Sequence, residues 1–193
     1  MDSQLLAWAR ADRRRCSDVP SLWLFTDSRR LPDPRPAVAR LPRGRAGVVL
    51  RHDNDPDRAT LGRDLARICR DRRLMLVVAG DARLAATLHA GVHLRGGRWP
   101  GPTRHSRGLV TSSAHGLADL WRAHNAGALL AFLSPVFPTV SHPDARVLGP
   151  LRWSRIACAG PLPIGALGGV HGGNIRRLHP RFCRAVGAIA ALA

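Results

Sequence analysis

Two glycines in a Leu-Gly-Gly-Val turn are the residues best suited to chemistry on a phosphate. Gly168 and Gly169 follow an apolar run, and the absence of side chains lets an anion approach their backbone N–H groups closely. Asn174 is placed to cap a helix after the turn, and a helix N-terminus favours negative charge. The turn therefore predicts a phosphate site, while a tight strand-to-helix turn remains the simpler explanation of the same residues.

A second candidate is the segment 134–142, which reads Ser-Pro-Val-Phe-Pro-Thr-Val-Ser-His. Its hydroxyl residues Thr139 and Ser141 alternate along the backbone, and the basic residue His142 follows at once. Hydroxyl donors beside a basic group suit an oxyanion. We interpret the segment as a loop that wraps a phosphate or a carboxylate.

Short apolar runs alternate with helix-like or turn-rich stretches along the chain, which is the pattern of β/α units with parallel strands. We predict an α/β fold, a compact (β/α)₈ TIM barrel. Its helices must be shortened, because such barrels typically need about 250 residues and this chain has 193. An open doubly wound sheet is the alternative, and either fold binds ligands beyond the C-terminal strand ends. Strands are expected at 22–26, 47–51, 74–79, 91–94, 108–113, 128–134, 162–167 and 185–189.

Helices are expected wherever apolar residues recur at helical spacing between these strands. The segments 28–45 and 95–107 lack this spacing and are expected to be irregular. The length of 193 residues indicates one domain, 1–193, with a helical extension at 1–20 before a barrel at 22–192. The predicted helices are 57–72, 81–90, 117–126, 150–159 and 174–178.

The net charge of +17 comes from arginine alone, since lysine is absent. Nucleic acid, anionic lipid and phosphorylated metabolites are all compatible with such a charge. Nucleic-acid binding is disfavoured because aromatic residues make up 5% of the chain and no binding motif is recognised. Apolar stretches are too short to span a membrane, and no secretory leader is recognised, so we expect a cytoplasmic protein.

The cysteines Cys16, Cys69, Cys158 and Cys183 lie far apart, which favours reduced, mostly buried thiols. The histidines show no zinc-ligand spacing. We expect His93 to be a hydrogen-bonded core residue, whereas His52 is equally compatible with catalysis and with the surface. Asp27 is interpreted as a turn cap, with substrate contact as the alternative.

Several segments in order resemble the thiamine phosphate synthase family. The first strand reads Leu22-Trp-Leu-Phe-Thr-Asp27, the second Gly47-Val-Val-Leu-Arg51, and the fourth Ala90-Gly-Val-His-Leu94. The Ser113-Ala-His115 triplet, the 134–142 loop and the Leu-Gly-Gly-Val turn follow in family order. The resemblance covers 22–192.

The resemblance implies a transferase that joins 4-amino-2-methylpyrimidine-5-methyl diphosphate to a thiazole phosphate and releases pyrophosphate, using Mg²⁺. The pyrimidine diphosphate and the thiazole phosphate are the implied small-molecule partners, and no protein nucleophile is needed. Carried over by position, Asp81 would bind the metal. The implied diphosphate residues are Arg51, Ser113, His142 and Arg98, and the implied thiazole phosphate residues are Thr139, Ser141, Gly168, Gly169, Ile189 and Ala190.

Departures from the family pattern weaken the diphosphate half of this site. In the Gln-x-Arg-x-Lys pattern of the second strand only Arg51 is kept, and Asp53 replaces the lysine. Gly80 replaces the asparagine before Asp81, and Arg98 stands near the position of the second magnesium carboxylate. The family lysine after the 134–142 hydroxyls is His142, and the serine of the last strand is Ala190.

Two hypotheses follow from these departures. In the first, Arg98 takes over the charge of Mg²⁺ and Asp53 balances it. In the second, the chain binds thiazole phosphate without transfer, as a catalytically degenerate barrel or like the related thiazole tautomerases. Those proteins rely on a histidine where this sequence has Pro135, so His142 or His115 would have to act as acid or base.

Overall fold

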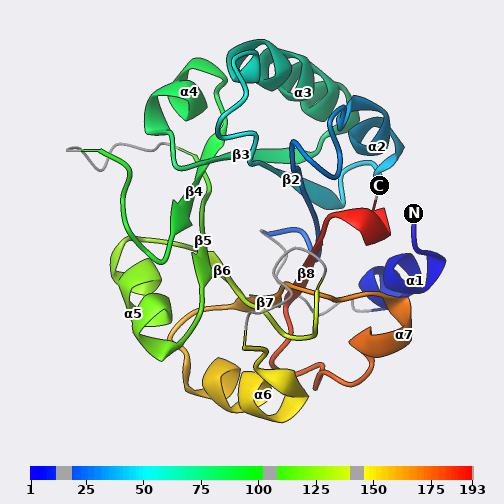
Figure 1. Ribbon diagram of the computed structural model, residues 1–193, viewed down its shortest axis with the longest axis vertical. Coiled ribbons are helices and arrows are strands. Elements are labelled where there is room, and N and C mark those ends of the chain that lie inside the picture. Colours follow the sequence, from blue (N-terminus) through cyan, green and yellow to red (C-terminus); the bar gives the residue numbers. More distant parts are fainter. Residues whose placement is uncertain (12–18, 102–107, 140–145, 193) are drawn as a thin grey trace.

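The eight strands of the chain close into one parallel barrel (Figure 1). The computed structural model describes residues 1–11, 19–101, 108–139 and 146–192. Strand β1 pairs with both β2 and β8, so the sheet has no free edge. The predicted barrel is confirmed, and the open doubly wound alternative is wrong. The strands are β1 (Leu22–Phe25), β2 (Ala46–Leu50), β3 (Met75–Ala79), β4 (Gly91–Arg95), β5 (Val110–Ala114), β6 (Leu130–Leu133), β7 (Ile164–Ala166) and β8 (Ala185–Ala188).

The helices surround the barrel and several are short, as the chain length requires (Figure 1). The segment 28–45 contains a helix that the sequence pattern did not predict, because its six residues are too few to show a period and only Ala37 and Val38 are buried. Within the described residues 95–101, no helix forms. The helices are α1 (Ser3–Ala11), α2 (Arg35–Arg40), α3 (Arg58–Arg72), α4 (Ala82–Thr87), α5 (Leu117–Asn125), α6 (Gly149–Ala159), α7 (Gly172–Ile175) and the 3₁₀ turn η1 (Ala190–Leu192).

Aromatic side chains fill the barrel interior, and glycines on neighbouring strands make room for them. Trp23 and Phe132 meet edge to face with their ring centroids 5.8 Å apart. A Cβ on Gly47 would lie 2.5 Å from Trp23 Cζ3, and one on Gly165 would lie 2.8 Å from Phe132 Cδ1. Each large ring therefore lies against a glycine of the next strand, which keeps a small barrel closely packed.

The N-terminal helix α1 packs beside α7 (Figure 1). The Asp2 carboxylate accepts hydrogen bonds from the N–H groups of Gln4 and Leu5, at the start of α1, and of Gly172 in α7. Although burial of the carboxyl opposes ionisation, these donors hold the pKa of Asp2 below its ordinary value. One carboxylate thus caps its own helix and attaches it to the barrel.

The cysteines only partly match the expectation of buried thiols. Cys69 and Cys183 are buried, and burial raises the pKa of the Cys69 thiol to about 12. Cys158 is exposed on α6, so its predicted burial is wrong, because its side of that helix faces away from the barrel. Cys16 lies outside the described residues. In the described ranges, no helix has the length and apolar character needed to cross a membrane.

Candidate functional site

Thr26, directly after β1, organises the backbone at the end of β2. Its buried hydroxyl oxygen accepts the Arg51 N–H at 2.9 Å and lies 2.9 Å from His52 Nδ1. His52 Nε2 faces the Pro32 carbonyl at 3.4 Å, and a carbonyl can only accept, so Nε2 carries the proton and Nδ1 accepts from Thr26. His52 is fully buried, so the expected surface position is wrong.

The guanidinium of Arg51 lies at the C-terminal end of β2, between charges of both signs. Burial lowers the pKa of Arg51, although the carboxylates of Asp27 and Asp53 favour its charged form. Asp27 accepts the N–H groups of Arg29 and Arg30 and pairs with the Arg30 side chain at 3.1 Å. The expected turn cap at Asp27 is confirmed, and Arg51, which stays protonated at neutral pH, is available for an anion.

His93 lies in the barrel interior below these charges. Its Nδ1 is 2.9 Å from Thr111 Oγ1, and its ring meets Phe25 edge to face at 5.5 Å. Burial, together with the positive charges of Arg51 and Arg95, lowers the pKa of His93 to about 3. The predicted core role is confirmed, and the ring stays neutral at physiological pH.

Two carboxylates at the ends of β2 and β3 are bound by guanidinium groups. Arg58 Nη2 lies 3.3 Å from Asp53 Oδ1, and Arg58 Nη1 lies 3.7 Å from Asp81 Oδ2. The same Nη2 donates to the Ala79 carbonyl at 2.6 Å. Arg95 Nη2 pairs with the other oxygen of Asp53 at 2.6 Å. We call Asp53, Arg58, Asp81 and Arg95 the mouth cluster.

The mouth cluster corrects the expected pairing of Asp53 with Arg98. Arg95 is the residue that pairs with Asp53, because it ends β4 and its guanidinium lies over Gly80. Arg98 follows two glycines, Gly96 and Gly97, in a tight turn and is exposed. A backbone bridge between Arg95 and Arg98 closes this turn.

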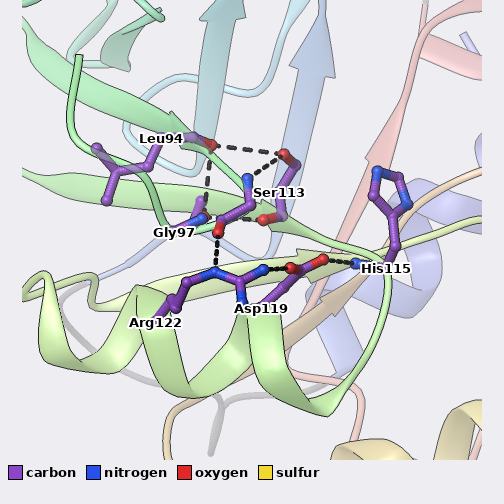
Figure 2. Close-up of polar contacts among 8 residues, drawn as sticks. Leu94, Gly97, Ser113, His115, Asp119 and Arg122 are labelled. Carbon is purple, nitrogen blue, oxygen red and sulfur yellow. Dashed lines mark hydrogen bonds and ion pairs between the residues drawn. The ribbon is translucent and has the colours of Figure 1, made fainter.

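Hydroxyls on β5 and side chains on α5 hold this turn in place (Figure 2). The Gly97 N–H donates to Ser112 Oγ at 3.0 Å, and the Gly96 N–H donates to Ser113 Oγ at 3.3 Å. Arg122 Nε donates to the Gly96 carbonyl at 3.0 Å, and the Arg122 guanidinium pairs with Asp119. Ser113, predicted to bind diphosphate, is half-buried here and supports the turn that follows Arg95.

The predicted phosphate turn lies across the barrel, at the end of β7. Gly168 and Gly169 both have positive φ, 90° and 66°, which favours glycine. Within the described residues, their N–H groups donate to no protein acceptor. Asn174 Nδ2 donates to the Gly169 carbonyl at 2.8 Å and so steadies the turn. Asn174 does cap α7, but as its third residue: His171 is the N-cap, and Asn174 Oδ1 accepts the His171 N–H at 2.9 Å.

The remaining thiazole phosphate candidates fall near the same turn or outside the described residues. Ile189 and Ala190 directly follow β8, the next strand of the barrel. Thr139 is half-buried at the end of the described segment after β6. Ser141 and His142 lie outside the described residues.

The carboxylates at this end of the barrel do not fit a divalent cation. Asp81 is the N-cap of α4: its Oδ1 accepts the Leu84 N–H at 2.9 Å, and its Oδ2 faces Arg58. Both oxygens of Asp53 face guanidinium groups. Mg²⁺ requires carboxylate oxygens open to the metal, and the described residues contain no group of three or more potential metal ligands.

Arg58 and Arg95 are site residues that sequence reasoning missed. Arg58 is the first residue of α3, a position that ordinarily faces solvent. Arg95 was recognised only as one of the residues that follow the expected strand 91–94. The only local signal was the arginine itself, since the pairings join residues 5 to 42 positions apart.

Arginines lie at the ends of β2 and β4, and at the end of β7 the N–H groups of Gly168 and Gly169 have no acceptor among the described residues. This arrangement defines a TIM-barrel protein whose site suits a ligand set with two anionic ends. The family described as thiamine monophosphate synthase matches residues 24–192, and the chain belongs to that family.

Individual relatives agree with the family. The thiamine-phosphate synthase of Halorhodospira halophila is 30% identical over 188 residues, 91% of this chain and 88% of that protein. The one from Synechococcus sp. (strain WH7803) is 31% identical over 74% of this chain, and the chain spans only 42% of that protein's length. Thiamine phosphate pyrophosphorylase from Pyrococcus furiosus superposes with a TM-score of 0.74 at 26% identity, covering 89% of this chain and 86% of that one.

Proposed function

We propose that this chain is a thiamine phosphate synthase: it joins the methylpyrimidine group of 4-amino-2-methylpyrimidine-5-methyl diphosphate to a thiazole phosphate. The bond between the methylene carbon and the diphosphate oxygen breaks, and pyrophosphate leaves with the electron pair. The thiazole nitrogen then donates its lone pair to the same carbon. Atoms and charge balance without a protein nucleophile.

The observation that carries the proposal is the separation of two groups of candidate anion donors across one barrel mouth. Arg51 and the mouth cluster lie at the ends of β2, β3 and β4. The free N–H groups of Gly168 and Gly169 lie at the end of β7, on the other side of the closed strand order. Each substrate in the proposed reaction carries one anionic group, so two separated sites hold their reactive ends between them.

The protein's contribution to the reaction is electrostatic and positional. Charge accumulates on the departing pyrophosphate, and fixed guanidinium groups stabilise that charge most effectively where little water intervenes. Thr26 holds the Arg51 backbone by a hydrogen bond and the Arg51 side chain is half-buried, so we expect little rearrangement as the charge develops. The Gly168–Gly169 turn would hold the thiazole phosphate in place through its free N–H groups.

A thiazole-binding protein without transferase activity is the second candidate. His115 Nδ1 donates to the Ser134 carbonyl at 3.0 Å, which places the ring beside Pro135 at the end of β6. The other ring nitrogen of His115 is then available as an acid or base at the strand end where tautomerases carry their histidine.

A binding and turnover experiment separates the two candidates. The protein is titrated calorimetrically with thiazole carboxylate phosphate and with the pyrimidine diphosphate, and thiamine phosphate formation is followed by chromatography. Binding of both with product formation supports the synthase. Binding of the thiazole phosphate alone refutes the synthase in favour of the second candidate, and binding of neither refutes both.

A further inference from the structure

We propose that the diphosphate end of the site binds its anion without a metal ion, because Arg58 occupies the position between Asp53 and Asp81 that a divalent cation would take. This inference rests on the proposed function, since it concerns the pyrophosphate released by that reaction. Arg51 and Arg95 then contact the anion directly.

The placement of Arg58 is that of a built-in cation. Its guanidinium bridges Asp53 and Asp81, at 3.3 Å and 3.7 Å, and donates to the Ala79 carbonyl at 2.6 Å. The side chain is only 15% exposed, so it is held in one position and not free in solvent. A carbonyl and two carboxylates are oxygen ligands of the kind that a hard cation prefers, and here one guanidinium contacts all three.

Arg95, at the end of the neighbouring strand β4, is the second arginine that replaces the charge of a metal ion. Its guanidinium pairs with Asp53 and lies where a side chain on Gly80 would extend: a Cβ there would be 3.0 Å from Nε and 3.1 Å from Cζ. Gly80 also has a φ of +66°, which disfavours other residues. The glycine therefore leaves space for the arginine, and at 57% exposure the Arg95 side chain remains open to a ligand.

The charge balance of this end agrees with direct anion binding. Four arginines oppose three carboxylates, which leaves a positive excess before any ligand enters: Arg30, Arg51, Arg58 and Arg95 against Asp27, Asp53 and Asp81. A divalent cation would have to break the ion pairs of Arg58 with both carboxylates and leave that guanidinium half-buried without its charge partners. Guanidinium groups bind phosphate oxygens through paired hydrogen bonds and need no metal to do so.

The first test measures binding of inorganic pyrophosphate by calorimetry, once in excess EDTA and once in Mg²⁺. We expect one site per chain, with affinity in EDTA at least equal to that in Mg²⁺. Mn²⁺ titration followed by electron paramagnetic resonance is expected to show no stoichiometric metal site in the free protein. Pyrophosphate binding that requires Mg²⁺, or a stoichiometric Mn²⁺ site, overturns the inference and leaves the proposed function intact.

Single-residue variants distinguish specific binding of pyrophosphate at this site from nonspecific attraction of anions to a basic protein. Arg95→Gln is expected to weaken pyrophosphate binding about tenfold or more in EDTA, with no rescue by Mg²⁺. Arg58→Gln is expected to lose binding in EDTA and regain it in Mg²⁺, because Asp53 and Asp81 become free to hold the metal. The matched control Arg67→Gln, exposed on the same helix, removes the same charge and is expected to bind as the wild type does.

Each outcome decides the inference. If Arg58→Gln does not fold, Arg95→Gln and the wild-type measurements still test it. Equal losses in Arg95→Gln and Arg67→Gln show nonspecific attraction and overturn it. Absence of pyrophosphate binding under both conditions overturns the inference alone, because thiazole phosphate binding and turnover test the proposed function separately.

Discussion

The buried His93 makes stability depend on pH in a range where carboxylates contribute little. In the folded protein its pKa is about 3, and in the unfolded chain the ordinary value of 6.5 applies. Between these values the unfolded state binds a proton that the folded state does not. Stability is therefore present above pH 6.5 and falls as the pH drops toward 3, with a limiting slope of about 1.4 kcal/mol per pH unit.

The expected loss attributable to His93 between pH 6.5 and pH 4.5 is about 2 kcal/mol. Urea unfolding at several pH values measures it, with the variant His93→Gln as comparison and His124→Gln, an exposed histidine on α5, as control. We expect the pH dependence to flatten in His93→Gln by that amount and to stay unchanged in His124→Gln. Asp2, Asp27 and Asp33, whose pKa values are lowered, contribute equally to all three proteins and cancel in the comparison.

Parallel pH profiles for the wild type and His93→Gln would refute this reasoning. They would mean that His93 is protonated in the folded protein or that the ring is hydrated. An NMR titration of the histidine ring protons gives an independent answer, since the His93 signals are expected to show no titration above pH 4.5.

Two further predictions concern packing and buried hydrogen bonds. Gly47→Ala places a Cβ against the Trp23 ring and is expected to reduce the free energy of unfolding by about 2 to 3 kcal/mol. In the control Gly116→Ala nothing lies within 4 Å of the new Cβ, and the expected cost is less than about 1 kcal/mol. Equal urea midpoints for the two variants would contradict the packing argument. Thr26→Val removes the hydroxyl that serves two buried groups and is expected to cost about 2 to 4 kcal/mol, while Thr26→Ser stays within about 1 kcal/mol of wild type in thermal unfolding.

Much of the fold was predictable because the signals are local and repeated. Each strand is a short apolar run, and the runs recur at intervals that suit β/α units. The helix at Arg35–Arg40 was missed because a six-residue segment with a proline at its start carries too few apolar residues to show a period. Its position is set by packing of Ala37 and Val38 against the barrel, which the pattern does not contain.

The candidate site was only partly predictable. Gly168 and Gly169 carry a signal in their residue type, since the absence of a side chain is itself the property that the turn needs. The role of Arg58 carries no such signal, because it depends on the Ala79 carbonyl 21 residues away. The histidines divide in the same way: residue type suggested a buried ring at His93, but the burial of His52 depends on Pro32 and Thr26 lying above it.

The sequence by itself determined the parallel barrel and the family, and it predicted a site at the C-terminal strand ends, since strand order and residue type at each end are properties of the chain. Tertiary structure alone decided which side chains meet there. The strand order β2-β3-β4 brings Asp53 near Arg95, 42 residues later, because Gly80 at the end of β3 has no side chain and leaves space for the Arg95 guanidinium. A side-chain pairing across strands depends on the strand register and on the space left by a third residue. Neither can be predicted from the local sequence.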